Sequence, residues 1–542
     1  MPLFEKCLQM GGKGRKALLF GKTGGERLAF FINALYNKSV VIAPEGLDCE
    51  KGRPLVRFSG GRNPIPNSID GTIQREIFMA RFVSWLFDKN FLRCMLPLAV
   101  PIALQNLLMC SFRIVDTLMI GQLGDVAIAA VGLAGQISFL VELIAFGFAA
   151  GASVFIAQYH GAGNRDGILR SFGATFLYCM PVGLLVTAAT FCFPGQVMAV
   201  LTNEPEMIEA GAAYLRYACF SCLGLCLYQP MAVLLRSTEN VRIPMFTSIV
   251  AALANAVLNY GLIFGRFGLP EMGVAGAGLA TAISSLINPL LMLIISLAQQ
   301  NVLAAPIKKF VDISPDFRRA YWRRVLPALL NEGIWGLSVI FMNMVFGRMG
   351  TDNYAALTVY RTIENIVFVF FIGICNACNI LIGKRIGEGN IPEVKDYSKR
   401  FICYIPLLGI TLGAGIILLR HPLVGLFDIS ATARATTLAM LVFYGMEVTF
   451  RNVPYLTIVG VFRGGGDTRF GLMADLFCQY LLSLPVAYVC GLVLGLPFLT
   501  TFIILYLVED GVKSVACFIH YRRMKWIRPV EGVPGIEEGQ EA

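Results

Sequence analysis

The stretch LRCMLPLAVPIALQNLLMCSFRIVDTLMIGQLG, residues 92–124, decides the fold class. It can cross a bilayer as one helix, because about 20 apolar residues rising 1.5 Å each span the ~30 Å hydrocarbon core. Asp116 lies inside it, and a charge at that depth costs at least about 2.5–3.5 kcal/mol, so it indicates an ion or proton site. The alternative is a carboxylate that reaches the membrane interface beside Arg113. Pro101 removes a backbone donor fifteen residues before Asp116 and lets the helix bend there.

The composition fits an integral membrane protein. Of the 542 residues, 56% are hydrophobic and 15% are charged, whereas about 25% are charged in soluble proteins. Apolar runs of about 20 residues recur to the end of the chain, which favours membrane helices over the short alternating strands of a β-barrel. Most cysteines lie inside these runs and the three histidines lie near predicted span ends, so we expect neither a disulfide scaffold nor a zinc enzyme.

Residues 1–91 differ from the rest of the chain. They are basic and glycine-rich, lack a sustained apolar period, and contain no apolar core of a secretory signal. Met79 begins the amphipathic stretch MARFVSWLFDKNFLRC, which leads into the first span and offers an alternative start. We therefore predict a poorly ordered basic extension over residues 1–91. A chain that begins at Met79 is expected to transport as well as the full chain.

We expect an all-α protein with twelve transmembrane helices. They are predicted over residues 92–121, 126–158, 168–192, 207–235, 243–265, 273–299, 322–348, 353–383, 399–420, 435–462, 470–494 and 497–520. The loops after the even-numbered spans and the C-terminal tail carry most lysines and arginines. Because basic loops stay on the cytoplasmic side, we expect both termini inside the cytoplasmic membrane, with Asp116 near the outer end of its span. The net charge of +10 thus reflects topology, and no nucleic-acid partner is expected.

An internal repeat with a shift of 226 residues organises these spans. The shift superposes Pro101 on Pro327, Gly147 on Gly373 and the turn 161–164 on the turn 387–390, and a shift of 227 superposes Arg236 on Arg463. Six helices that repeat with the same topology imply two pseudo-symmetric bundles about an axis along the membrane normal, with a binding cavity between them. The predicted parts are an extension 1–91, an N-terminal six-helix bundle 92–300, a cytoplasmic linker 301–321, a C-terminal six-helix bundle 322–520 and a cytoplasmic tail 521–542.

Four motifs resemble the multidrug and toxic compound extrusion (MATE) transporters. They are IVDTLMIGQLGD at 114–125, AQYHGAGN at 157–164, GVAGAGLAT at 273–281 and GVFRGGGDTR at 460–469. The resemblance runs from about residue 92 to 520 and includes the six-plus-six layout. It implies export of cationic or amphipathic organic molecules in exchange for Na⁺ or H⁺, with no other cofactor and no enzyme activity. We expect a monomer in the bilayer.

The resemblance places an ion or proton site in the N-terminal bundle. The first-helix aspartate of the family falls on Asp116 and its bend-forming proline falls on Pro101. In some relatives, positions matching Asn255, Asn259 and Thr281 complete a cation site, with an aspartate where this chain has Asn259. Since Asn255 and Asn259 are spaced i, i+4, they share one helix face. Interhelical hydrogen bonding is the alternative role for these three side chains.

Three polar residues of the C-terminal bundle are candidates for a coupling role. Some relatives use acidic residues in the seventh and tenth spans for Na⁺. Counting back from GVFRG puts the tenth-span position on Asn452 rather than on Glu447, and Glu332 lies about one turn from the seventh-span position. Glu447 has an alternative, because Arg451 lies at i+4 and would meet it on the helix surface.

Five further polar or aromatic residues are candidates for the substrate cavity. Arg361 and Glu364 lie one turn apart, so they either neutralise each other or line the cavity and sense substrate charge. Tyr228 would stack on an aromatic cation, unless it is a packing residue. Gln105 and Asn106 are the polar residues of the first span that the repeat carries onto the seventh.

The expected function is antiport. A cation or proton from outside occupies Asp116 and shifts the first span about Pro101, and the substrate site between the bundles weakens, because one ligand drives another only through differential binding to two conformations. The first alternative is a flippase for lipids or lipid-linked saccharides, which would favour a strongly cationic cavity. A membrane enzyme or a channel would need a nucleophile–base set or a repeated filter loop, and the sequence shows neither.

Overall fold

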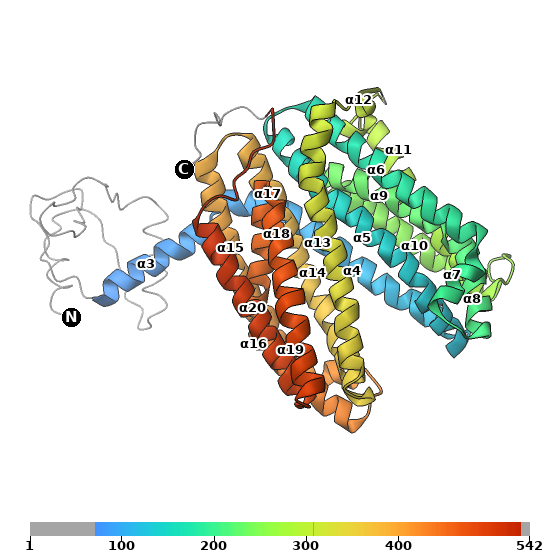
Figure 1. Cartoon of the computed structure of the whole chain (residues 1–542). Coiled ribbons are helices and arrows are strands. Elements are labelled where there is room, and N and C mark those ends of the chain that lie inside the picture. Colours follow the sequence, from blue (N-terminus) through green and yellow to red (C-terminus); the bar gives the residue numbers. More distant parts are fainter. Residues whose placement is uncertain (1–70, 307, 533–542) are drawn as a thin grey trace, which may run out of the picture. The chain divides into compact units, whose positions relative to one another are not determined.

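The computed structural model of the chain describes residues 71–306 and 308–532. Its first unit, Met1–Asp88, contains the described helix α3 (Gly71–Leu86), and Met79 lies inside this helix. Most of the predicted extension lies outside the described residues. The second unit, Lys89–Ala542, holds all the other helices and is described by itself below (Figure 1).

The N-terminal half of the second unit is helical throughout its described length. Its helices are α4 (Lys89–Gly121), α5 (Asp125–Gly161), α6 (Arg165–Cys192), α7 (Pro194–Leu201), α8 (Pro205–Ala218), α9 (Phe220–Ser237), α10 (Arg242–Phe264) and α11 (Gly273–Ala298). The predicted fourth span is therefore two helices, α8 and α9. The short helices η1 (Val302–Ala304) and α12 (Lys308–Val311) follow in the predicted linker.

The C-terminal half repeats this plan with more irregular helices. Its elements are α13 (Pro315–Gly347), α14 (Thr351–Gly387), α15 (Ile391–Gly425), α16 (Ala431–Tyr455), η2 (Leu456–Phe462), α17 (Arg463–Gly465), α18 (Thr468–Asp475), η3 (Leu476–Ser483), α19 (Leu484–Tyr488), η4 (Val489–Val493) and α20 (Phe498–Arg522). The segments η2, η3 and η4 are π-helical. The helix α13 begins at Pro315, seven residues before the predicted start of the seventh span at residue 322.

Ten helices of the described residues are long and apolar enough to cross a membrane. The two predicted spans outside this set, 435–462 and 497–520, correspond to α16 with η2 and to α20. The first carries two charged residues near its middle, Glu447 and Arg451, and the second carries three, Glu509, Asp510 and Lys513, which lowers their hydropathy. The number of twelve transmembrane helices therefore stays a prediction.

The same turn begins α6 and α15, as the repeat predicts. Asn164 accepts a hydrogen bond from the Gly167 backbone and caps α6, and Asn390 accepts one from the Glu393 backbone and caps α15. The glycine before each cap has a left-handed φ, +68° and +71°, which glycine adopts without steric cost.

Repeated glycines also bring the two halves together. A Cβ added to Gly147 of α5 would lie 2.8 Å from the Leu329 Cα atom of α13, and one added to Gly373 of α14 would lie 2.8 Å from the Ala103 Cβ atom of α4. The residue pairs 147–329 and 373–103 are related by the 226-residue shift. Each half therefore packs its second long helix against the first long helix of the other half.

This contact is tightest at one end of the second unit, which we call the joined end. A Cβ on Gly161 of α5 would lie 1.9 Å from the Lys384 carbonyl oxygen, and one on Gly387 of α14 would lie 1.9 Å from the Gln158 carbonyl oxygen. Figure 1 shows the two halves together at the end where α12 lies and apart toward the end where α8 and α19 lie. Larger residues at these two positions would force the helices apart.

The C-terminal tail fastens the joined end. The Arg528 backbone N–H donates to the Gly465 carbonyl oxygen over 2.7 Å, and the Val530 N–H donates to the Gln158 side-chain oxygen over 2.8 Å. The Trp526 side chain is fully buried. Since Gln158 belongs to the N-terminal half and Gly465 to the C-terminal half, the tail binds both.

We expect Trp526→Ala to destabilise the protein by about 3–5 kcal/mol, because a buried tryptophan leaves a cavity when truncated. Unfolding of the purified protein in detergent measures the effect. Lys525→Ala is the matched control, since Lys525 is the exposed neighbour in the same segment. Equal effects of the two substitutions would show that the tail does not stabilise the joined end.

An ion pair also links the halves at the joined end. Glu239, in the loop after α9, lies 2.8 Å from the Lys384 ammonium nitrogen and 3.7 Å from the His160 ring nitrogen. Hydrogen bonding from His160 and Lys384 lowers the pKa of Glu239 to about 2. A free glutamate has a pKa of about 4.3. The ion pair of Glu239 therefore stabilises the folded protein fully above about pH 4.3, and this stabilisation is lost as the pH falls toward about 2.

The melting temperatures of the native protein and of Glu239→Gln should therefore differ at pH 6 and converge as the pH is lowered from about 4.3 to about 2. The comparison needs Glu209→Gln as control, because Glu209 is an exposed carboxylate of α8. A difference that stayed constant over this range would contradict the assigned role of Glu239.

Candidate functional site

Of the predicted residues of the N-terminal half, Asn259 and Asn255 are linked to Asp116 by hydrogen bonds, whereas the Thr281 hydroxyl donates to the Ala277 carbonyl oxygen of its own helix. The half-buried Asp116 lies on α4 and accepts a short hydrogen bond from the amide nitrogen of Asn259 on α10. The same nitrogen donates to the Asn255 side-chain oxygen over 3.2 Å, as the i, i+4 spacing predicts. Asn255 in turn donates to the Ser284 hydroxyl over 3.2 Å, and that hydroxyl donates to the Thr281 carbonyl oxygen over 3.1 Å.

This cluster offers oxygen atoms to a cation. The side-chain oxygen of Asn259 is buried and accepts no hydrogen bond from the described residues, although it lies beside the Asp116 carboxylate. Buried amide oxygens are ordinarily paired, so an unpaired one beside a carboxylate fits a site for a proton or a hard cation. Ser284 was missed in the sequence, and its spacing of three from Thr281 is the signal that could have found it.

Arg113 does not accompany Asp116. Its guanidinium contacts both carboxylate oxygens of Glu142 on α5 at 3.1 Å. In the alternative reading, Arg113 would hold Asp116 at the membrane interface. Arg113 is paired with Glu142 instead, so this reading lacks the contact on which it depends.

Pro101 lies inside the continuous helix α4, four residues after Pro97. Because Pro101 has no N–H, the Pro97 carbonyl lacks its usual helical donor, which weakens the helix there. Asn106, one turn further on, donates to the Ile102 carbonyl of its own helix over 2.7 Å. The hinge stays a prediction, and the missing donor supports it.

Gln105 and Tyr228 belong to one hydrogen-bonded polar network, in which Gln105 is buried and Tyr228 is partly buried. The Gln105 amide nitrogen donates to the Tyr228 hydroxyl over 2.7 Å and to Ser248 over 2.8 Å. Arg236 donates to the Gln105 oxygen over 3.1 Å and to Tyr228 over 3.0 Å. The aromatic ring of Tyr228 is thus held by its hydroxyl, and Gln105 is 3% exposed.

The C-terminal half contains the charged counterpart of this network. Arg463 donates to Glu332 over 2.9 Å, and its side chain and that of Glu332 are 6% and 13% exposed. Arg236 reaches back 131 residues to Gln105, and Arg463 reaches back 131 residues to Glu332. An arginine thus donates to a side chain of the first long helix in both halves. The acceptor is the Gln105 amide oxygen in the N-terminal half and the Glu332 carboxylate in the C-terminal half, so only the second contact is an ion pair.

Two same-helix ion pairs that the sequence left open as alternatives do not form in the C-terminal half. Arg361 bonds to Asn343 on α13, and Glu364 instead pairs over 2.6 Å with Arg451 of α16. The alternative pairs Arg361–Glu364 and Glu447–Arg451 both placed the partner on the same helix. Neighbouring helices supply closer partners here, because α14 and α16 pack together.

The three predicted coupling residues of the C-terminal half do not form one cluster. Glu332 pairs with Arg463, whereas Asn452 donates to the Val448 carbonyl of its own helix over 3.2 Å. Glu447 faces α20 and accepts no hydrogen bond from a donor among the described residues. The geometry therefore supports an ion site around Asp116 better than one around these residues.

Another buried ion pair was missed in the sequence. Lys513 of α20 lies 2.5 Å from the Asp475 carboxylate of α18 and 3.9 Å from Glu509, which accepts a hydrogen bond from Ser483 over 2.8 Å. The signal was available, because all three charges stand inside predicted spans, as Asp116 does.

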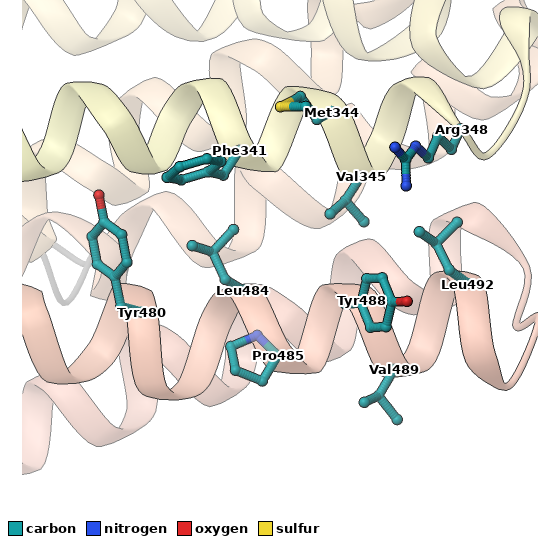
Figure 2. A pocket seen from close by; sticks show the side chains of 10 residues that line it. All are labelled: Phe341, Met344, Val345, Arg348, Tyr480, Leu484, Pro485, Tyr488, Val489 and Leu492. Carbon is teal, nitrogen blue, oxygen red and sulfur yellow. The ribbon is translucent and has the colours of Figure 1, made fainter.

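A groove of about 480 Å³ runs between α13 and the segment from η3 to η4. Figure 2 shows its apolar side chains from both walls facing one another, with Arg348 at one end. Among the residues that line it are Phe341, Met344, Leu484 and Tyr488. None of the predicted site residues lines this groove.

The comparisons with known proteins agree on one family. The MatE family model matches residues 101–261 and 327–489. The "Probable multidrug resistance protein NorM" of Thermotoga maritima is 25% identical over 395 residues, which make up 73% of this chain and 84% of that protein. The "Multidrug resistance protein MdtK" of Edwardsiella ictaluri is 26% identical over 413 residues, 74% of this chain and 88% of that protein.

Solved structures share the fold. One described as the "outward-facing conformation of a multidrug resistance MATE family transporter of the MOP superfamily" aligns with a TM-score of 0.73 and 19% identity, covering 82% of this chain and 97% of that chain. The two ranges matched by the family model fall on the two repeated halves and together make up more than half of the sequence. The chain therefore belongs to the MatE family, whose members are membrane transporters and not enzymes.

Proposed function

We propose that this protein is a Na⁺- or H⁺-coupled antiporter that exports organic, mostly cationic amphipathic compounds across the cytoplasmic membrane. The observation that carries the proposal is the half-buried Asp116 carboxylate, bonded to Asn259 inside a membrane helix. The names of the relatives, multidrug resistance proteins NorM and MdtK, support the substrate class. A monomer with both termini in the cytoplasm is part of the proposal.

The proposed coupling follows from competition at one carboxylate. When a proton or cation occupies Asp116, its charge is neutralised, and an organic cation loses an electrostatic partner between the halves. Because α4 packs against α14 of the other half at Gly373, a rearrangement of α4 about Pro101 would alter how the halves lie together. Only a ligand that binds two conformations differently can drive such a change.

The flippase alternative lacks a supporting observation. A lipid flippase would be expected to present free positive charge to an anionic headgroup. Of the arginines inside the helices of the C-terminal half, Arg451 and Arg463 are each paired with a carboxylate, and Arg361 donates to the Asn343 side-chain oxygen.

Ethidium efflux from proteoliposomes tests the proposal. The full chain is reconstituted, loaded with ethidium, and exposed first to an inward Na⁺ gradient and then to an inward proton gradient. We expect efflux that depends on one of the two gradients. Efflux that is equal with and without both gradients would contradict antiport.

A further inference from the structure

A second pocket, of about 350 Å³, lies between α16 and α20. Two carboxyl groups, Glu447 from α16 and Asp510 from α20, line it together with the aromatic rings of Phe443 and Phe450. None of the residues proposed for the Asp116 site belongs to it. The pocket therefore needs an explanation of its own.

The two carboxyl groups have no basic partner of their own. Glu447 is 8% exposed, and neither of its carboxylate oxygens accepts a hydrogen bond from a donor among the described residues. One carboxylate oxygen of Asp510 is buried and equally unpaired. Both groups line the same pocket, so a shared proton or a bound cation between them would satisfy both.

The nearby bases are already engaged. Arg451, which also lines the pocket, pairs with Glu364 over 2.6 Å, donates to the Tyr360 hydroxyl over 3.1 Å and lies 4.4 Å from the centre of the Tyr506 ring. Lys513, one turn beyond Asp510, is held by Asp475 over 2.5 Å. The pocket therefore keeps an excess of negative charge.

Figure 1 shows α16 and α20 on the side of the C-terminal half away from the N-terminal half. Three residues of the pocket lining, Met446, Phe450 and Leu507, are 58%, 70% and 58% exposed, so the pocket is open to the surroundings of the protein. The carboxyl groups lie near the middle of the predicted spans 435–462 and 497–520, where uncompensated charge is expensive and favours a compensating ligand from the hydrocarbon phase.

The chemistry of the lining selects the ligand. Carboxylates attract a cation, the rings of Phe443 and Phe450 add cation–π and apolar contact, and the volume lies in the range of small-molecule sites. We propose that this pocket is a lipid-side binding site for an amphipathic organic cation, whose charge lies at Glu447 and Asp510. The inference rests on the proposed function only for its choice of ligand class.

Photolabelling of the full chain in lipid nanodiscs tests the site. The probe is a photoreactive derivative of tetraphenylphosphonium, and labelled peptides are identified by mass spectrometry. We expect label on α16 and α20, displaced by excess tetraphenylphosphonium but not by tetraphenylborate, which has the same shape and the opposite charge. Equal displacement by the anion would overturn the proposal.

Two variants separate charge from space. The double variant Glu447→Gln/Asp510→Asn should reduce labelling of α16 and α20 at least about tenfold. Gly511→Leu keeps both carboxyl groups and fills the pocket, because a Cβ added at Gly511 meets nothing within 4 Å. Gly511→Leu should block labelling of α16 and α20 as well. Leucine has a higher helix propensity than glycine, so this variant should fold and test the pocket even where the double variant fails to fold.

Asp428→Asn is the control, since it removes one exposed carboxylate of the same half outside the pocket. Labelling should survive this substitution, and it should also survive Asp116→Asn. Labelling that persists in Gly511→Leu would overturn the inference alone, whereas gradient-independent efflux with intact labelling would overturn the proposed function alone.

Discussion

Asp116→Asn should abolish ion-driven efflux, with a loss of at least about 100-fold, while the protein remains folded in the membrane. An asparagine stays neutral, so a coupling ion no longer competes with substrate at this position. A coupling free energy of about 1–3 kcal/mol between ion and substrate corresponds to a change of about 5- to 150-fold in substrate affinity. The fold should survive, because the asparagine oxygen can still accept the hydrogen bond that Asn259 donates.

The matched control is Asp125→Asn. Asp125 is an exposed carboxylate in the first turn of α5, nine residues further along the chain, and it makes the same change of charge. Reconstituted vesicles with equal amounts of each protein give the efflux rates. Normal rates in Asp116→Asn, or equal losses in both variants, would remove Asp116 from the coupling role.

The second large effect concerns the buried pair Glu332–Arg463. Arg463→Met should destabilise the protein by about 3–5 kcal/mol, because it leaves the buried Glu332 carboxylate without its partner. The double variant Glu332→Gln/Arg463→Met should recover most of that loss, since no charge is then left unpaired. Reversible unfolding in mixed micelles gives the four free energies of a double-mutant cycle.

The same variants decide what Glu332 does. Arg348→Met serves as control, because Arg348 is an exposed arginine directly after α13. A stable double variant that still exchanges ion for substrate would assign Glu332 to structure. Restored stability without exchange would return Glu332 to the coupling role that its position in the seventh span suggests.

Sequence reasoning was most successful where the repeat and helix spacing carry the information. The turns at Asn164 and Asn390 follow from glycine and asparagine punctuation at one shift. The Asn255–Asn259 contact follows from i, i+4 spacing on one helix. Such local patterns survive folding because they depend on neighbours in the chain.

Contacts between helices were predicted less well. Spacing alone favoured Arg361 as the partner of Glu364, but Arg451 comes from a different helix and approaches more closely. The Glu447–Asp510 juxtaposition joins α16 to α20, and no periodicity in one segment reveals it. Helix rotation and pairing depend on packing of whole surfaces, which the sequence of one span does not specify.

The measurement that tests the central claim most directly is ion release on substrate binding. Ethidium is titrated into purified protein in weak buffer, and released protons and Na⁺ are followed together. We expect about one ion released for each ethidium bound, and none from Asp116→Asn. Ethidium binding without ion release in the native protein, or undiminished release in Asp116→Asn, would contradict competition at this carboxylate.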